Sequence, residues 1–185
     1  MTKARDTANI IKQPFTQTLG TSNYRAGVNA GNSIASGGNN NTVVGDEAGT
    51  ALTTGDDNVA IGFEALKTED AHGRNVAVGY QSLKTLNAGV VAVTTTVGYK
   101  SGTSLTTGVQ NTLIGGLAGD ALTDADYNVA VGNNTLSTDT QGSKSTAIGY
   151  EALTAQNFTS ATDSHNTAVG HQAGAAVTTG TENTL

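Results

Sequence analysis

The sequence contains no cysteine, no tryptophan and one proline, and only 4% of its 185 residues are aromatic. Without cysteine, neither disulfide bonds nor thiolate metal ligands contribute to its stability. Charged residues make up 13%, about half of the quarter found in ordinary soluble domains. Large apolar side chains are scarce as well. These shortages favour a thin core in which backbone and small side chains stack closely.

Several classes of partner are also excluded by what is missing. The net charge is −6 and no basic patch occurs, so we expect no nucleic-acid partner. There is no run of about 18 apolar residues, so we expect no membrane insertion. The N-terminal stretch "MTKARDTANIIKQPFTQ" lacks the apolar region of a secretory signal peptide.

What the sequence does contain is a repeat of the pentad Asn-x-x-(Val/Ile)-Gly. Eight copies share one register, mostly 17 residues apart, with two spacings of 19 and 21. A ninth start stands at Asn183, and "NYRAG" from Asn23 is a degenerate earlier copy. Self-similarity at a fixed period indicates a repeat architecture. The eight starts are Asn41, Asn58, Asn75, Thr94, Asn111, Asn128, Ser145 and Asn166.

We number the columns of the repeat from its first residue. Column four is β-branched in every copy, which is typical of a strand residue facing a core, so we predict that it fills the interior. Column five is always Gly, which indicates a positive φ or an approach too close for a Cβ atom. The predicted core columns are Val44, Ile61, Val78, Val97, Ile114, Val131, Ile148 and Val169, with Gly45, Gly62, Gly79, Gly98, Gly115, Gly132, Gly149 and Gly170.

Three further columns follow rules. Column one is mostly Asn, which suits a corner and can form side-chain ladders when identical residues stack. Where column nine is Gly, column twelve is Leu or Val; where column nine is Leu, column twelve is polar, except at Leu86. We interpret this as two coil variants that fill a similar volume.

Short strands between Gly- and Asn-marked corners, with no helical spacing, predict an all-β fold. One repeat per coil gives a parallel β-solenoid of about eight 17-residue coils, stacked at about 4.8 Å. The solenoid shaft covers residues 41–185, residues 23–40 form a transition or degenerate first coil, and residues 1–22 form an extended N-terminal segment. Because no cap protects the last edge, we expect the natural protein to continue beyond residue 185.

Both faces of the pentad are mostly apolar and uncharged, since columns two and four point one way and columns three and five the other. A strand with two such faces is buried on both sides. One face can pack inside its own coil, and the other needs a partner. We therefore expect a homo-oligomer with the pentads near its axis; the periodicity alone gives no count of chains.

The pentads with their continuations, "NVAIGFEA", "NVAVGYQS", "STAIGYEA" and "NTAVGHQA", resemble the head repeats of trimeric autotransporter adhesins, the YadA-like β-roll. That resemblance implies a left-handed parallel β-roll in an intertwined homotrimer. The coils here are longer than those of the family. The sequence shows neither the signal peptide nor the C-terminal membrane barrel that such an adhesin requires.

The same repeats are similar to those of tail-fibre proteins of tailed bacteriophages, and the opening "MTKARDTAN" is similar to the start of many such proteins from marine and cyanobacterial phages. This resemblance implies a virion protein, assembled in the host cytoplasm, whose residues 1–22 attach to other tail, baseplate or neck proteins. The solenoid would form the fibre shaft that projects toward the host. The alternative is an adhesin module that binds a host-surface glycan or protein.

Candidate catalytic and metal-binding residues are few. The three histidines, His72, His165 and His171, are interpreted as solvated residues near corners, so no metal and no cofactor is expected. Glu47, Glu64 and Glu151 share column seven, and carboxylates on adjacent coils could serve glycoside hydrolysis, as in a phage depolymerase. A solvated face of the rod is the favoured interpretation, and we predict no catalytic residue and no enzyme.

Column six holds Phe63, Tyr80 and Tyr99 in consecutive coils. Such a column either stabilises a sheet face by stacking or forms an exposed binding strip. An ice-binding solenoid needs unbroken ranks of Thr, and in column two these ranks are interrupted by Val59, Val76 and Val129. The extra residues in "TLNAGVVAV" and "AQNFTSATDSH" are expected to bulge from a corner.

Overall fold

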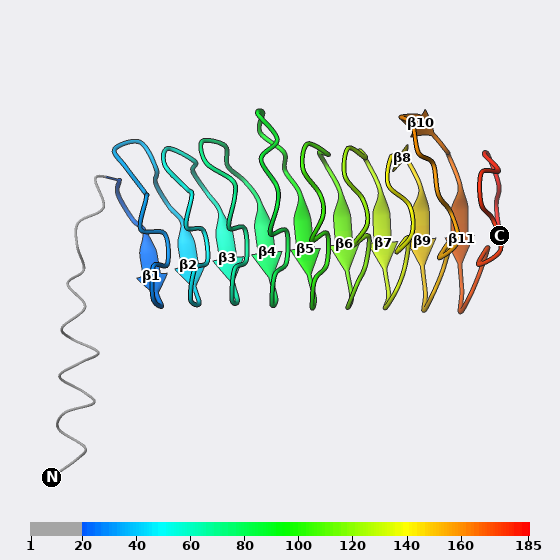
Figure 1. The fold of residues 1–185 in the computed structure, drawn as a ribbon, viewed down its shortest axis with the longest axis horizontal. Coiled ribbons are helices and arrows are strands. Elements are labelled where there is room, and N and C mark those ends of the chain that lie inside the picture. Colours follow the sequence, from blue (N-terminus) through cyan, green and yellow to red (C-terminus); the bar gives the residue numbers. More distant parts are fainter. Residues whose placement is uncertain (1–19) are drawn as a thin grey trace, which may run out of the picture.

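The computed structural model describes residues 20–185, so most of the predicted attachment segment, residues 1–22, lies outside the described part. The described residues form an all-β rod, a parallel β-solenoid of about nine turns, which confirms the predicted fold class (Figure 1). No helix of residues 20–185 is long and apolar enough to cross a membrane. The long sheet contains β1 (Tyr24–Ala26), β2 (Thr42–Val44), β3 (Val59–Ile61), β4 (Val76–Val78), β5 (Thr95–Val97), β6 (Thr112–Ile114), β7 (Val129–Val131), β9 (Thr146–Ile148) and β11 (Thr167–Val169).

The strands pair in chain order, all parallel, and every residue lies opposite the same column of the next coil. Val43, for example, pairs with Ala60, and Ala60 with Ala77. β1 lies in register at the end of this sheet, so the degenerate copy beginning at Asn23 adds a coil to the eight counted from the pentads. Figure 1 shows the strands side by side along the long axis of the rod.

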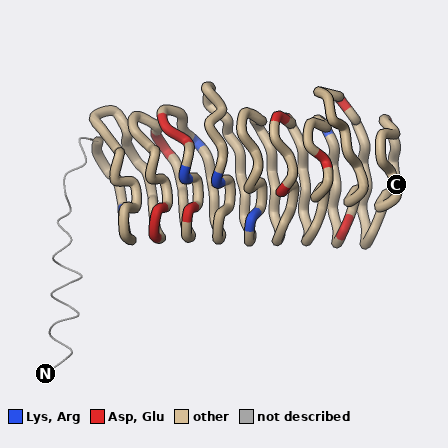
Figure 2. Tube along the Cα trace, viewed as in Figure 1, with Lys and Arg blue, Asp and Glu red and all other residues tan. Residues whose placement is uncertain are grey.

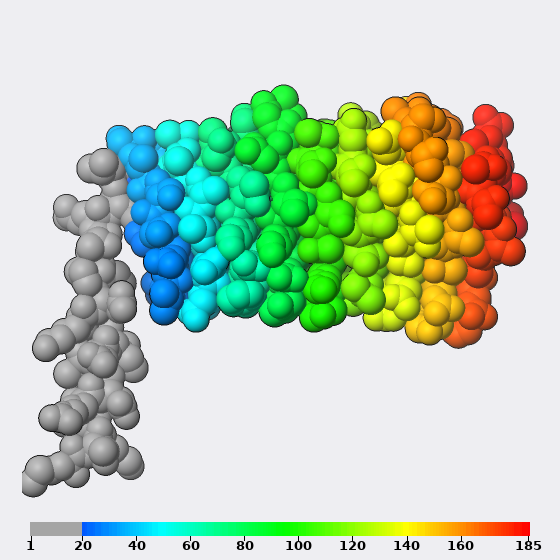
Figure 3. All heavy atoms as spheres, viewed as in Figure 1, coloured from blue at the N-terminus to red at the C-terminus, as the bar shows by residue number. Residues whose placement is uncertain are grey.

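The two insertions form different structures at the same side of the rod. Residues of the first, Val90, Val91 and Val93, are about half exposed. The second contains β10 (Thr162–Asp163), which pairs in parallel with β8 (Gly142–Ser143) of the preceding coil. Both segments protrude from the otherwise continuous surface of the rod, as expected for insertions at a corner (Figure 3).

The glycines of column five satisfy both conditions that the sequence suggested. Their φ angles lie between 124° and 143°, a region that residues with a Cβ rarely adopt. A Cβ built on Gly45 would also lie 2.6 Å from the carbonyl oxygen of Gly62 in the next coil. The same overlap recurs at each step up to Gly149, and only at Gly170 is the space open.

The column-one asparagines form the expected ladder, with each side chain joining two coils. Oδ1 of Asn41 accepts a hydrogen bond of 2.9 Å from the backbone N–H of Asn58, and Oδ1 of Asn58 accepts one of 3.0 Å from Asn75. The Nδ2 group of Asn41 donates to the Gly55 carbonyl at 2.8 Å, within its own coil. These buried side chains therefore satisfy backbone groups at the corner that the strands leave unpaired.

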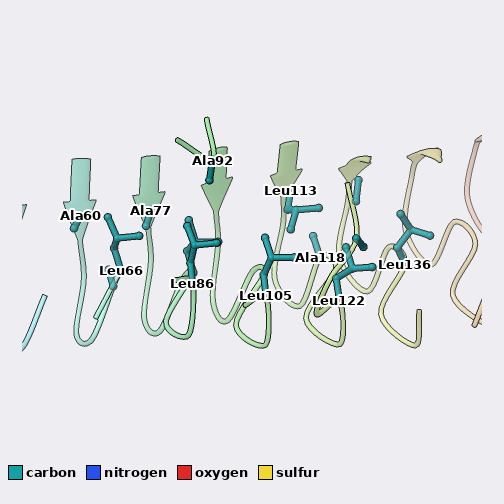
Figure 4. Packing of buried hydrophobic residues seen from close by; sticks show 14 of the residues in the cluster. Ala60, Leu66, Ala77, Leu86, Ala92, Leu105, Leu113, Ala118, Leu122 and Leu136 are labelled. Atoms are coloured by element: carbon teal, nitrogen blue, oxygen red, sulfur yellow. The ribbon is translucent and has the colours of Figure 1, made fainter. Parts of the chain in front are cut away.

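The prediction that column four fills the interior of the coil is wrong for the single chain. Column three is inside instead: its eight residues, mostly alanines, are fully buried, whereas Ile61 and Ile114 of column four are 37% and 38% exposed. The physical reason is space, because leucines of columns nine and twelve already occupy the interior opposite the strand (Figure 4). The inner columns are Val43, Ala60, Ala77, Thr96, Leu113, Ala130, Ala147 and Ala168.

The complementarity of columns nine and twelve has a steric cause. A Cβ added at Gly119 would lie 2.8 Å from Cδ1 of Leu122, so the two positions compete for one volume. When Leu stands at column nine, as at Leu136, it fills this space, and column twelve is polar in three of the four coils; in the fourth, Leu83 and Leu86 are both buried. Column nine has a left-handed backbone in every coil, with φ of 57° at Gly119 and 49° at Leu136. The two coil variants inferred from the sequence are therefore confirmed.

We expect Gly98→Ala to destabilise the rod more than Gly170→Ala, although their φ angles, 143° and 140°, are alike. At Gly98 the new Cβ would lie 2.5 Å from the carbonyl carbon of Gly115, whereas at Gly170 the nearest atom is 3.8 Å away. Both variants carry backbone strain of about 1–3 kcal/mol, so the difference between them measures the overlap between coils. Urea unfolding followed by circular dichroism gives both free energies. Equal losses would contradict the overlap.

A double-mutant cycle tests the shared volume. Gly119→Leu alone should overpack the coil at a cost of about 1–3 kcal/mol, and Leu122→Gln alone should cost about 1–3 kcal/mol by replacing a buried apolar side chain with an amide that lacks partners. The double variant reproduces the arrangement of Leu153 and Gln156, so its loss should be smaller than the sum of the two single losses. Additive free energies of unfolding would show that the two columns do not share a site.

Candidate interaction surface

The outward face of the long sheet, formed by columns two and four, carries no charged side chain. Among its nine strands the single charged residue is Arg25, which belongs to the inward column and donates from Nε to the Ala30 carbonyl at 2.6 Å. Figure 2 shows acidic and basic residues concentrated in the segments between the strands. From β2 onward the exposed part of this face consists of β-branched side chains, including Ile61, Val97 and Ile148, and on β1 it includes Tyr24. An uncharged strip of Val, Ile and Thr that runs the length of a rod is an extended surface on which a partner can pack.

Beside the outward face runs the aromatic ladder of Phe63, Tyr80 and Tyr99. The rings of Phe63 and Tyr80 stack with centroids 5.4 Å apart, and those of Tyr80 and Tyr99 are also 5.4 Å apart. Lys100 Nζ lies 5.5 Å from the centre of the Tyr99 ring. All three rings are nevertheless 41–53% exposed. The rings therefore stack, as the first of the two interpretations requires, and they are also exposed; the binding strip stays a prediction.

The column-seven carboxylates take part in ion pairs rather than facing one another across a cleft. Lys67 Nζ lies 2.5 Å from Glu47 Oε2 and 2.6 Å from Glu64 Oε1, and Lys84 Nζ lies 2.7 Å from Glu64 Oε2. Hydrogen bonds from Lys67, then Lys84 and Gln81, lower the pKa of Glu64 to about 2. A carboxyl group held ionised in this way cannot act as a general acid near neutral pH.

Glu151 has a different environment, five coils further along the rod from Glu64. Its Oε2 accepts a hydrogen bond of 2.8 Å from Gln172, and this bond, with a smaller contribution from Tyr150, lowers the pKa of Glu151. The structure thus places Glu151 away from Glu47 and Glu64 in the coil order, with an amide as its neighbour. That no residue is catalytic remains a prediction.

The three histidines are not brought together. His171 stacks on Tyr150 with centroids 5.1 Å apart, and His165 is an exposed corner residue with a φ of 50°. His72 differs from both, because its ring lies beside Glu69 and Asp70 at one corner of the rod. We call these three residues, Glu69, Asp70 and His72, the corner cluster.

Glu69 is the residue that sequence reasoning undervalued. It occupies column twelve beside a column-nine leucine, so its side chain points into the coil and is fully buried. Burial raises the pKa of Glu69, while the backbone N–H groups of His72 and Ala88 and the His72 ring oppose that rise. The rule for columns nine and twelve already marked Glu69 as a polar residue at a position that is otherwise apolar. The sequence alone did not show which groups its side chain contacts.

The ion pairs of Glu64 predict how stability depends on pH. Because its folded pKa of about 2 lies below the ordinary value of 4.5, its contribution is complete above about pH 4.5 and is lost as the pH falls toward 2. Replacing both partners, Lys67→Met with Lys84→Met, should lower the free energy of unfolding at pH 7 and leave it nearly unchanged at pH 2. Urea unfolding at several pH values between 2 and 7 gives the free energy of unfolding of the parent protein and of the double variant, and hence the slope of each against pH.

The matched control is Lys144→Met, which removes an ion pair of 2.5 Å with Asp163 between exposed side chains. Exposed pairs contribute only about 0–1 kcal/mol. The free energy of unfolding of the Lys144→Met variant should therefore depend on pH as that of the parent protein does. A double variant with the parent slope would contradict the assignment of Glu64.

Comparison of the chain with protein-family models, curated proteins and solved structures finds no match. The likeness to adhesin head repeats and phage tail-fibre repeats therefore depends on the residues quoted for it. The structure establishes the solenoid itself: a parallel β-rod with a stacked aromatic ladder and an uncharged, outward-facing strip of β-branched side chains.

Proposed function

We propose that this chain is a structural part of a phage virion, the shaft of a trimeric tail fibre that attaches through its N-terminal segment and projects toward the host. The observation that carries the proposal is the uncharged outward face, which continues over nine strands of a regular rod. The number three and the virion location come from the resemblance of the repeats, and the attachment role belongs to residues 1–22.

The contacts between coils support a mechanical role. Successive coils are held together by strand pairing and by the N–H groups of column five; that of Gly62, for example, donates to the carbonyl of Val44 at 2.7 Å. The hydrogen bonds of the asparagine ladder join most pairs of neighbouring coils as well. These bonds run along the long axis, and they recur from coil to coil. A rod built in this way transmits force and position along its length, which is what a shaft requires.

A second copy of the chain is the partner that fits the outward face. The face repeats at the spacing of parallel strands, about 4.8 Å, so a partner that covers all of it must repeat at the same spacing. The chain itself has that period. The face has no charge to repel a like copy, and its half-exposed β-branched side chains gain by leaving water. Self-association therefore covers the face along its whole length.

The aromatic ladder favours a second candidate, an adhesin module that binds a host glycan. Phe63, Tyr80 and Tyr99 cover one another's faces by stacking, and their exposed edges form an apolar strip that a glycan can contact. The two candidates differ in what they require of the outward face, because glycan binding to the ladder does not depend on column four.

We expect the chain to have three times its mass of 18.5 kDa by light scattering. Ile114→Glu should raise the dissociation constant of the oligomer by more than about 100-fold, since burying an unpaired carboxylate costs several kcal/mol. Circular dichroism should remain unchanged, because Ile114 faces outward. Analytical ultracentrifugation of both proteins provides the measurement.

Thr138→Glu is the control, since Thr138 is exposed and lies outside the strands. It should leave the mass unchanged. A monomeric parent protein, or an Ile114→Glu variant that stays fully assembled, would refute self-association through the outward face. An intact oligomer in both variants together with glycan binding that is lost in Tyr80→Ala would favour the adhesin module.

A further inference from the structure

The two buried acids of column twelve, Glu69 and Asp139, have unequal surroundings. Oδ1 of Asp139 accepts hydrogen bonds of 3.0 Å from the N–H groups of Gly142 and Phe158, and Oδ2 accepts one of 2.6 Å from Gln156 of the next coil. Both of its oxygens are therefore satisfied. Asp139 has a complete structural role at its position.

Glu69 repeats only part of this arrangement. Its Oε1 accepts a hydrogen bond of 3.2 Å from the N–H of His72, three residues on, as Asp139 accepts from Gly142. Its Oε2, however, is buried with no hydrogen-bond partner. The next coil has Leu86 where Gln156 would stand, so the side-chain donor that serves Asp139 has no counterpart, and the backbone N–H of Ala88 is the group of that coil that acts on the Glu69 carboxylate. A buried carboxylate oxygen without a partner costs free energy and calls for an explanation.

The neighbours of Glu69 are two further side chains that bind metal ions. Nδ1 of His72 lies 3.3 Å from Glu69 Oε1, and one donor atom from each residue of the corner cluster lies within 4.8 Å of the others. Asp70 is half-buried and uses Oδ1 to accept from the N–H of Ala71 at 2.6 Å, while Oδ2 makes no such bond. At the coil of Asp139 the corresponding positions hold Thr140 and Gly142, which supply no such set.

The corner cluster is also reachable from solvent. His72 lines a shallow pocket of about 150 Å³ whose other walls include Asp56 and Asp57 of the preceding coil and Val91 of the first insertion. An ion can therefore approach the His72 ring without passing through the interior of the rod. The two aspartates add negative charge along this path.

We propose that Glu69, Asp70 and His72 form a binding site for one divalent transition-metal ion of the zinc type. One imidazole nitrogen and two carboxylates are donors that such an ion accepts at about 2.0–2.2 Å, with water in the fourth position. A calcium ion is a poorer fit, because it takes about six to eight oxygen ligands and no imidazole. Sequence analysis predicts no metal here, because an isolated His72 at a corner does not reveal the buried oxygen next to it.

Binding requires a small movement and gives a structural benefit. The donors of a tetrahedral ion lie about 3.4 Å apart at these bond lengths, so donors spread over as much as 4.8 Å must close around it. Asp70 and His72 are on the surface and can move, whereas buried Glu69 stays in place. The bound ion satisfies the carboxylate of Glu69 and ties the corner together just before the first insertion.

Cobalt(II) is the probe for this site, since it binds zinc sites and its visible absorption reports the ligand geometry. The full chain, first stripped with a chelator, should take up one Co²⁺ per chain with an intense visible band, and Zn²⁺ should abolish the band. His72→Gln should weaken Co²⁺ binding by more than about tenfold, the lower end of what even an outer-shell change costs. Zn²⁺ should also raise the melting temperature of the parent protein but not of this variant.

His165→Gln is the matched control, because it removes an exposed corner histidine that lies outside the corner cluster, and it should bind Co²⁺ as the parent does. Asp70→Asn keeps the hydrogen bond to Ala71 while removing the charge, so it should weaken binding even if His72→Gln proves to be misfolded by circular dichroism. No band at equimolar Co²⁺, or unchanged binding in Asp70→Asn and a folded His72→Gln, would overturn the proposal.

Discussion

The approach of each column-five backbone to the glycine carbonyl of the next coil is the contact on which the rod depends. It leaves no room for a side chain, so it holds successive coils at the spacing that lets the strands pair in register. It also forces the chain to leave the strand with a positive φ. The corner that follows is therefore the same in every coil, and so are the ladders that stand on it.

Because the backbone follows the same course in every coil, the interior is narrow everywhere. The large side chain that fills it comes from different columns in different coils. In most coils a leucine reaches this space either from column nine or from column twelve, and the other position is polar or Gly respectively; the coil that holds both Leu83 and Leu86 is the exception. The polar variant places Glu69, Asp139 and Gln156 fully inside the rod. Buried hydrogen-bonding groups in this protein thus arise from a packing choice, and only their neighbours decide whether each is satisfied.

Much of this fold could be predicted from the residues themselves. The period, the Gly column and the asparagine ladder are local patterns, and each led directly to the stacked parallel coils. The orientation of the strand could not be predicted in this way. Side-chain size favoured Ile61 over Ala60 as the inner residue, but the leucines across the coil had already taken the space, and this competition is visible only in three dimensions. The corner cluster was not predicted from the sequence for the same reason, because only the folded coil shows that Glu69 and His72 lie side by side.

The asparagine ladder is not uniform along the rod, and this affects how the rod yields. At the fifth coil Thr94 replaces Asn, and its hydroxyl accepts from the N–H of Asn111 only at 3.4 Å, while Nδ2 of Asn75 has no partner. The corner is thus held less firmly beside the first insertion than at Asn58 or Asn128. When the rod is pulled along its axis or heated, we expect this corner to open before the corners at Asn58 and Asn128, so that yielding begins beside an insertion rather than at the ends of the rod.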